Sequence, residues 1–224
     1  MYPFLFPPTA NKPPYSDTPV RVTTSGNASL FHGVPDWVYE EEVFSSDYAL
    51  WWAPDASALA FLAFDETAVD EYTFPIYNPS EDAHAVVPYP EHVVMKYPKP
   101  GYANPLVQVH VFRLDRYLAS ARQAGGAGAG NVDAARLARE ATVELDWDGR
   151  FARDNSVIAE VAWVSGSALL VKEVDRAAED GHVVYFDLGD GTNVGTPVRK
   201  LGKDGEQGDD GWIDAVRAAS FVLI

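Results

Sequence analysis

Three consecutive glutamates, Glu40, Glu41 and Glu42, are the residues of this sequence best suited to recognising a charged group. Adjacent carboxylates repel one another, so a chain that needs only solubility usually spreads them out. Aromatic and aliphatic residues flank the three acids within residues 36–44, and such side chains favour burial. These apolar neighbours would hold the segment on a surface, and the carboxylates would then face a partner with which they could form charge-assisted hydrogen bonds.

The composition narrows the classes of partner. The chain has 224 residues, of which 47% are hydrophobic and 12% aromatic, enough for the core of one sizeable domain or a small pair. Its formal net charge is −16. Nucleic acids and anionic membrane surfaces require basic patches, so this charge argues against both. It fits an acidic domain or a domain that receives a cationic ligand.

No metal or cofactor is expected. The chain has no cysteine, which excludes disulfides and thiolate metal sites but leaves the compartment open. Its five histidines are scattered without ligand spacing. Two acidic glycine loops, at 189–192 and 204–210, do not match a hand-type calcium loop and are interpreted as surface hairpins. The glycine run at 125–130 is too irregular and too poor in basic residues for a phosphate loop.

The acidic segment is predicted to be helical within a chain that is otherwise of β character. Asp36 is a suitable N-cap, and residues 37–44 could form about two helical turns. A glycine-rich loop at 123–130 and a short helix at 132–140 are interpreted as an insertion between strands. Strands are predicted at 20–24, 48–52, 58–64, 71–77, 93–97, 106–112, 141–145, 158–163, 168–174, 182–188 and 196–201.

One arrangement occurs twice along the chain. A strand, a tryptophan, a tight turn and an apolar strand follow one another at 49–61 and again at 158–174. The apolar run at 58–64 suits a buried central strand. This loose repeat favours a β-propeller over a sandwich or a barrel, and the expected fold class is all-β.

Targeting signals are weak. The first eight residues are apolar but lack a basic region and are interrupted by prolines, so they are not expected to be a signal peptide. No stretch approaches the roughly 20 apolar residues that a membrane span needs. Asn27 begins an Asn-Ala-Ser sequon, which matters only if the chain enters the secretory route.

The acidic segment and its flanks also resemble a known family. Gly33 to Phe44, followed by Ala49 to Asp55, is similar to the propeller of dipeptidyl peptidase IV-type serine peptidases of the prolyl oligopeptidase clan. The resemblance covers most of residues 20–214. Further similar segments are 65–72 and 97–105. The segment 160–178, and 198–203 together with 209–214, resemble the fungal aminopeptidase branch.

The resemblance implies a fold and a ligand. In this family an eight-bladed propeller caps an α/β-hydrolase domain, so residues 1–224 would be a fragment of about half of the propeller. Substrates are peptides with a free N-terminus and proline or alanine in second position, and a dipeptide is released. A short projecting helix carries two glutamates that hold the substrate ammonium, which by position are Glu41 and Glu42. Family members follow the secretory route and are vacuolar-membrane, cell-surface or secreted proteins.

The sequence contains no recognisable catalytic residue. A nucleophile elbow would read G-x-S-x-G, and no such pattern occurs. We therefore expect a portion that gates substrate and is not catalytic alone, with the remaining blades and the hydrolase domain supplied by the same gene or by a partner chain. The alternatives are a non-enzymatic, propeller-derived protein-binding module, or a truncated or degenerate gene product.

Overall fold

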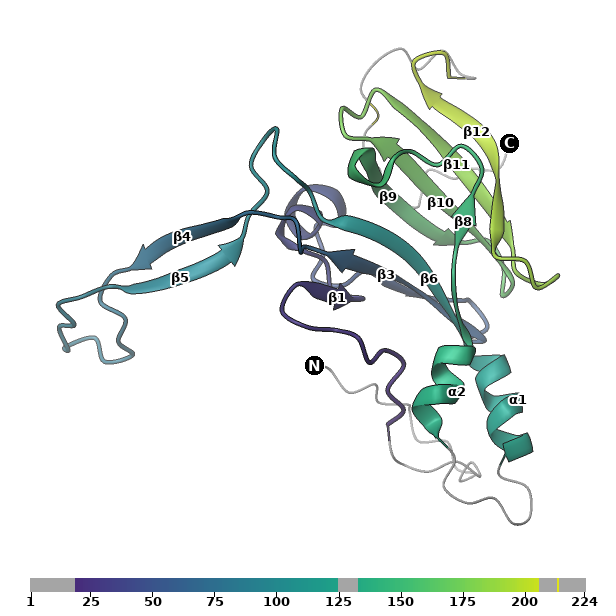
Figure 1. The fold of residues 1–224 in the computed structure, drawn as a ribbon, viewed down its shortest axis with the longest axis horizontal. Helices are drawn as coiled ribbons and strands as arrows, with labels where there is room; N and C mark the ends of the chain where they lie inside the picture. Colours follow the sequence, from purple (N-terminus) through teal and green to yellow (C-terminus); the bar gives the residue numbers. More distant parts are fainter. Residues whose placement is uncertain (1–18, 125–132, 206–212, 214–224) are drawn as a thin grey trace.

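The computed structural model describes residues 19–124, 133–205 and Ile213. Two curved sheets lie next to each other, and a two-stranded arm extends away from them (Figure 1). The strands are β1 (Leu30–His32), β2 (Leu50–Trp52), β3 (Ala58–Asp65), β4 (Glu71–Ile76), β5 (Glu91–Lys96), β6 (Leu106–Arg113), β7 (Thr142–Glu144), β8 (Asp146–Trp147), β9 (Ser156–Trp163), β10 (Ala168–Asp175), β11 (Asp180–Asp187) and β12 (Val194–Gly202). The helices are the π-helix η1 (Tyr39–Phe44), α1 (Leu114–Ala124), α2 (Ala134–Glu140) and the 3-10 helix η2 (Arg153–Asn155).

The first sheet is built around β3. This strand pairs antiparallel with β6 on one side, and on the other side it pairs with β2 and then β1, which share one edge. β7 follows β6. Side chains alternate between the two faces of a strand, and here both faces are covered. Leu59 and Phe61 pack with α1 and α2, whereas Leu62 and Phe64 face the second sheet. The predicted central position of this apolar strand is confirmed.

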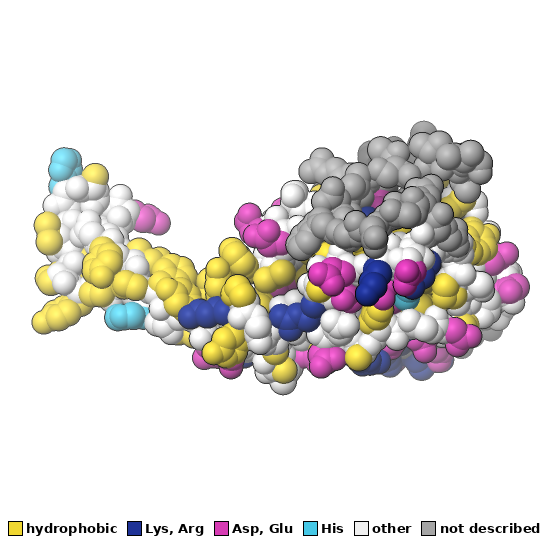
Figure 2. Space-filling view, turned by 90° about the horizontal axis from the view of Figure 1, so that it is seen from above, with side chains coloured by type: hydrophobic (Ala, Val, Ile, Leu, Met, Phe, Trp, Pro, Cys, Tyr) yellow, Lys and Arg dark blue, Asp and Glu magenta, His cyan; other side chains and the backbone are white. Residues whose placement is uncertain are grey.

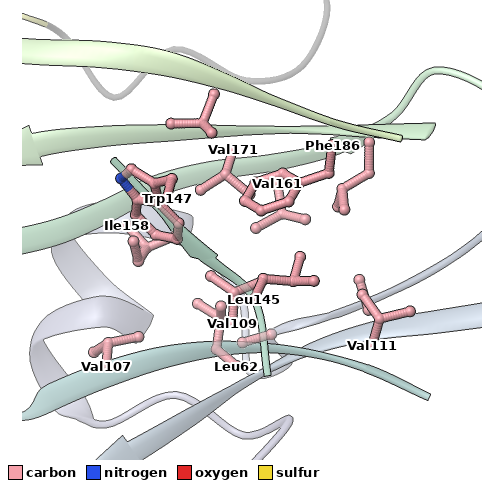
Figure 3. Close-up of a cluster of buried hydrophobic side chains, with 14 of the residues drawn as sticks. Leu62, Val107, Val109, Val111, Leu145, Trp147, Ile158, Val161, Val171 and Phe186 are labelled. Carbon is pink, nitrogen blue, oxygen red and sulfur yellow. The ribbon is translucent and has the colours of Figure 1, made fainter. Parts of the chain in front are cut away.

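The second sheet is an antiparallel meander from β9 to β12. The short strand β8 runs parallel to β12 at its outer edge. One face of this sheet packs against the first sheet, and the side chains between them form the main core (Figure 3). Leu62 and Val109 come from the first sheet, whereas Val161, Val171 and Phe186 come from the second.

The repeated strand–tryptophan–turn–strand pattern corresponds to two hairpins that touch. They are β2–β3 and β9–β10. Trp163 Nε1 donates to the carbonyl oxygen of Trp51 at 2.9 Å, and Ser57 Oγ donates to the carbonyl oxygen of Gly166 at 3.2 Å. Two blade-like sheets packed through equivalent hairpins confirm the expected all-β class and partial propeller.

The arm consists of β4 and β5, paired antiparallel over their full length. It projects from the sheets, and hydrophobic side chains lie along it (Figure 2). Both strands were expected from the sequence, but their separation from the two sheets was not. The arm carries several exposed large apolar side chains, namely Tyr72, Ile76, Tyr77, Val86, Val87, Tyr89 and Val94.

One local prediction is wrong, and one helix was not expected. Residues 20–24 form no strand, because no segment in the described part of the chain pairs with them. α1 was not expected, although it covers the first sheet with its buried Tyr117. The predicted helix at 132–140 is confirmed as α2.

Other expectations fall outside the described residues. These are the proline-rich start, the glycine run and most of the loop at 204–210. Among the described residues, no group of three or more His, Cys, Asp or Glu side chains is arranged to hold a metal. No helix of the described part is long and apolar enough to cross a membrane.

Candidate functional site

Residues 37–44, here called the acidic helix, begin at a side-chain cap. The carboxylate of Asp36 accepts hydrogen bonds from the backbone N–H groups of Val38 and Tyr39, both at 3.1 Å. Its carbonyl oxygen accepts from the N–H of Glu40 at 2.9 Å. These bonds satisfy donors that would otherwise lack partners at the start of a helix. The predicted cap and helix are confirmed.

The acidic helix is wider than an α-helix over most of its length. From Tyr39 to Phe44 it is a π-helix, and the N–H of Ser45 donates to the carbonyl oxygen of Glu40, five residues earlier. Ser45 ends it in the left-handed conformation, with φ 49°. Single π-turns of this kind occur frequently at functional sites. Residues four and five positions apart therefore lie one above the other on this helix.

Aromatic side chains anchor the acidic helix to both sheets. Tyr39 is 1% exposed and its hydroxyl oxygen accepts from the backbone N–H of Ile158 in β9 at 3.1 Å. Its ring packs edge-on against Phe64 of β3, with centroids 5.0 Å apart. Phe44 makes a similar contact with Trp51 of β2 at 5.7 Å. Burial raises the pKa of Tyr39, so its phenol remains neutral.

The glutamates occupy the opposite, solvent side of the acidic helix. Glu41 and Glu42 are exposed, whereas Glu40 is half-buried. Within the described part of the chain, neither Glu41 nor Glu42 forms a hydrogen bond or an ion pair. The structure thus presents two adjacent carboxylates, without a protein partner among those residues, on a firmly anchored helix. An ammonium group has three donors, so it can use both carboxylates at once.

Two further acids are buried near the start of the acidic helix. Asp36 is 3% exposed, and Glu66, which directly follows β3, is 4% exposed. Burial raises the pKa of Asp36. Burial and then the charge of Asp36 raise the pKa of Glu66 to about 7, and nearby Lys96 opposes this rise. Sequence reasoning missed Glu66, because its place two residues after the apolar run at 58–64 does not show which neighbours bury it.

Another buried carboxylate joins the strands of the second sheet. Glu173 of β10 has no exposed surface and accepts from Trp147 Nε1 at 2.8 Å and from Ser156 Oγ at 2.5 Å. His182 Nε2 lies 2.8 Å from the same carboxylate. Trp147 Nε1 also lies 3.0 Å from His182 Nε2. When that nitrogen donates its proton to Glu173 it cannot also accept a hydrogen bond, so Trp147 donates to Glu173. The cluster connects four strands and is interpreted as structural.

The sequon residue Asn27 is exposed. Its side-chain oxygen accepts from the backbone N–H of Ser29 at 2.8 Å. Its glycosylation stays a prediction.

Comparisons with known proteins agree on one family. The model of the dipeptidyl peptidase IV (DPP IV) N-terminal region matches residues 12–222. A probable dipeptidyl-aminopeptidase B of Neurospora crassa is 35% identical over 211 residues, covering 92% of this chain and 20% of the relative. A probable dipeptidyl peptidase 4 of Aspergillus fumigatus is 30% identical over 204 residues, covering 90% of this chain and 22% of the relative.

A solved structure agrees with the fold. Dipeptidyl peptidase 4 of Porphyromonas gingivalis superposes with a TM-score of 0.63 at 26% identity, covering 89% of this chain and 23% of that one. A putative dipeptidyl aminopeptidase IV from Bacteroides ovatus matches with a TM-score of 0.51 at 18% identity, which supports the fold alone. The chain spans about a fifth of the length of the curated relatives it matches.

Proposed function

The chain belongs to the dipeptidyl peptidase IV N-terminal region family, and on this premise we propose that it binds the free amino terminus of a peptide through Glu41 and Glu42. The observation that carries the proposal is the exposed, adjacent pair of carboxylates on the anchored acidic helix. Charge-assisted hydrogen bonds from one ammonium to two carboxylates are stronger than neutral ones and geometrically selective.

Amine binding would also set which peptide bond is cut. A substrate fixed at its amino end presents a bond at a constant distance from that end to a nucleophile held elsewhere. This is the chemistry of a dipeptidyl peptidase, the activity named for the relatives. The substrates would be peptides with proline or alanine in second position. The net charge of −16 would favour the approach of cationic amino termini.

The proposed role is recognition without bond cleavage. Residues 1–224 would be part of the N-terminal propeller, and a hydrolase domain would supply the nucleophile. The absence of a G-x-S-x-G pattern from the sequence supports this division. The corresponding assay uses an Ala-Pro chromogenic amide. Turnover by the chain that a serine-directed inhibitor abolishes would contradict the non-catalytic part of the proposal.

Calorimetry tests the recognition itself. A peptide beginning Ala-Pro is titrated into the chain with its amino terminus free and again with it acetylated. Binding should require the free amine and should disappear in the double variant Glu41→Gln plus Glu42→Gln. Glu40→Gln is the matched control, since it removes one neighbouring charge and should leave most of the affinity.

The second candidate is a protein-binding module without a peptidase role. The arm favours it, because Tyr77 is 77% exposed and Tyr89 is 83% exposed, as expected of a surface that meets another protein. Peptide binding that is indifferent to acetylation would support this candidate over amine recognition.

A further inference from the structure

The root of the arm touches the acidic helix through aromatic rings. Trp37, in the first turn of the acidic helix, packs against Tyr97 with ring centroids 4.6 Å apart. Tyr97 packs against Tyr72 of β4 at 5.6 Å, and Tyr72 stacks with Phe74 at 6.4 Å. Lys99 Nζ lies 4.9 Å from the centre of the Tyr72 ring. A continuous row of rings therefore connects the arm with the acidic helix.

Tyr97 itself is held by the backbone at the arm root. Its N–H donates to the carbonyl oxygen of Asp70 at 3.0 Å. The preceding Lys96 donates through Nζ to the carbonyl oxygen of Val69 at 2.7 Å, and the following Pro98 is buried. Val69 is 2% exposed. The backbone of Tyr97 is thus held by a hydrogen-bonded and partly buried frame, and its ring contacts Trp37 and Tyr72.

Trp37 lies about one helical turn before the two glutamates in the acidic helix. Glu41 and Glu42 follow it by four and five positions, so the turn that Trp37 begins leads into the π-helix that carries both carboxylates. The other aromatic anchors, Tyr39 and Phe44, attach the helix to the sheets. A helix of about two turns is marginal without such contacts, so each anchor contributes to its orientation.

We propose that Tyr97 is a positioning residue for the Glu41–Glu42 pair, because its contact with Trp37 fixes the turn from which both carboxylates project. The expected effect of Tyr97 on peptide binding rests on the proposed amine recognition. The effect of Tyr97 on the order of the acidic helix does not rest on it, and can be measured without any ligand.

The test uses the full 224-residue chain and three variants. Tyr97→Ala removes the ring, Tyr97→Phe keeps it, and Tyr89→Ala is the matched control at the exposed tip of the same arm. Hydrogen exchange of the backbone amides at 38–46 reports the order of the acidic helix, and exchange in β9 to β11 reports the rest of the fold. Calorimetry with an Ala-Pro peptide, whose amino terminus is free or acetylated, measures how tightly Glu41 and Glu42 bind the free amine.

Tyr97→Ala should accelerate exchange at 38–46 by about two- to tenfold, the effect of one aromatic pair, while β9 to β11 keep their rates. The same variant should weaken free-amine binding by a similar factor. Tyr97→Phe and Tyr89→Ala should both keep the exchange rates at 38–46 and the free-amine affinity of the unmodified chain.

The inference is overturned if exchange at 38–46 is unchanged in Tyr97→Ala, if it rises equally across the sheets, or if it rises while free-amine affinity stays the same. Failure of the proposed function has a different signature. The unmodified chain would then bind free and acetylated peptides alike, and the exchange data would still decide whether Tyr97 orders the acidic helix.

Discussion

Glu66 provides a quantitative test of the electrostatics at the start of the acidic helix. Its side chain is buried, and the negative charge of the helix cap Asp36 helps to raise its pKa. The change is Glu66→Gln, which keeps the size of the side chain and removes its charge. Glu81→Gln is the control, since Glu81 is an exposed glutamate in the loop of the arm.

The magnitude follows from the pKa of Glu66, which rises from 4.5 in the unfolded chain to about 7 in the folded one. Between these two values the folded protein keeps a proton that the unfolded chain has lost, so stability falls as the pH rises. The full difference corresponds to about 3 kcal/mol. Solvent near the carboxyl group screens the charge, which reduces this to about 1–2 kcal/mol.

The assay is urea unfolding followed by tryptophan fluorescence from pH 4.5 to 8. The unmodified chain should lose about 1–2 kcal/mol of unfolding free energy across this range relative to Glu66→Gln, and the variant should be the more stable of the two above pH 7. Glu81→Gln should follow the unmodified chain. Parallel curves for the unmodified chain and Glu66→Gln would refute the reasoning.

Two further predictions concern the anchors and the second sheet. Tyr39→Phe should lower the unfolding free energy by about 1–3 kcal/mol, because the buried N–H of Ile158 loses its acceptor; unchanged stability would show that this bond is replaced. Glu173→Gln should lower the unfolding free energy in urea by about 3 kcal/mol or more. The amide NH2 group of glutamine cannot accept hydrogen bonds, so it would face donors such as Trp147 Nε1 and Ser156 Oγ without a bond. A loss under about 1 kcal/mol would contradict the structural interpretation of that cluster.

The acidic helix could be predicted from sequence because its determinants are local. Asp36 at the cap, apolar residues at helical spacing and the run of acids all lie within nine positions of the chain. The strands of both sheets were also largely predictable, since β3 and its partners carry continuous or alternating apolar patterns.

The supports of the site could not be predicted because they come from distant parts of the chain. Glu66 and Tyr97 approach the acidic helix only once β3 and the arm are placed. The direction of β4 and β5 is likewise a tertiary property, because their pattern fits a strand in a sheet as well as an arm. The strand predicted at 20–24 failed for the same reason, as an alternating pattern does not create a pairing partner.

A double-mutant cycle on amine recognition tests the central claim most directly. Binding of an Ala-Pro peptide, with its amino terminus free or acetylated, is measured for the unmodified chain and separately for Glu41→Gln and Glu42→Gln. The account predicts a coupling energy of about 1 kcal/mol or more between the ammonium and each of Glu41 and Glu42. The coupling energy measured with Glu40→Gln should be smaller. Coupling of zero for both Glu41 and Glu42, with equal affinity for free and acetylated peptide, would contradict it.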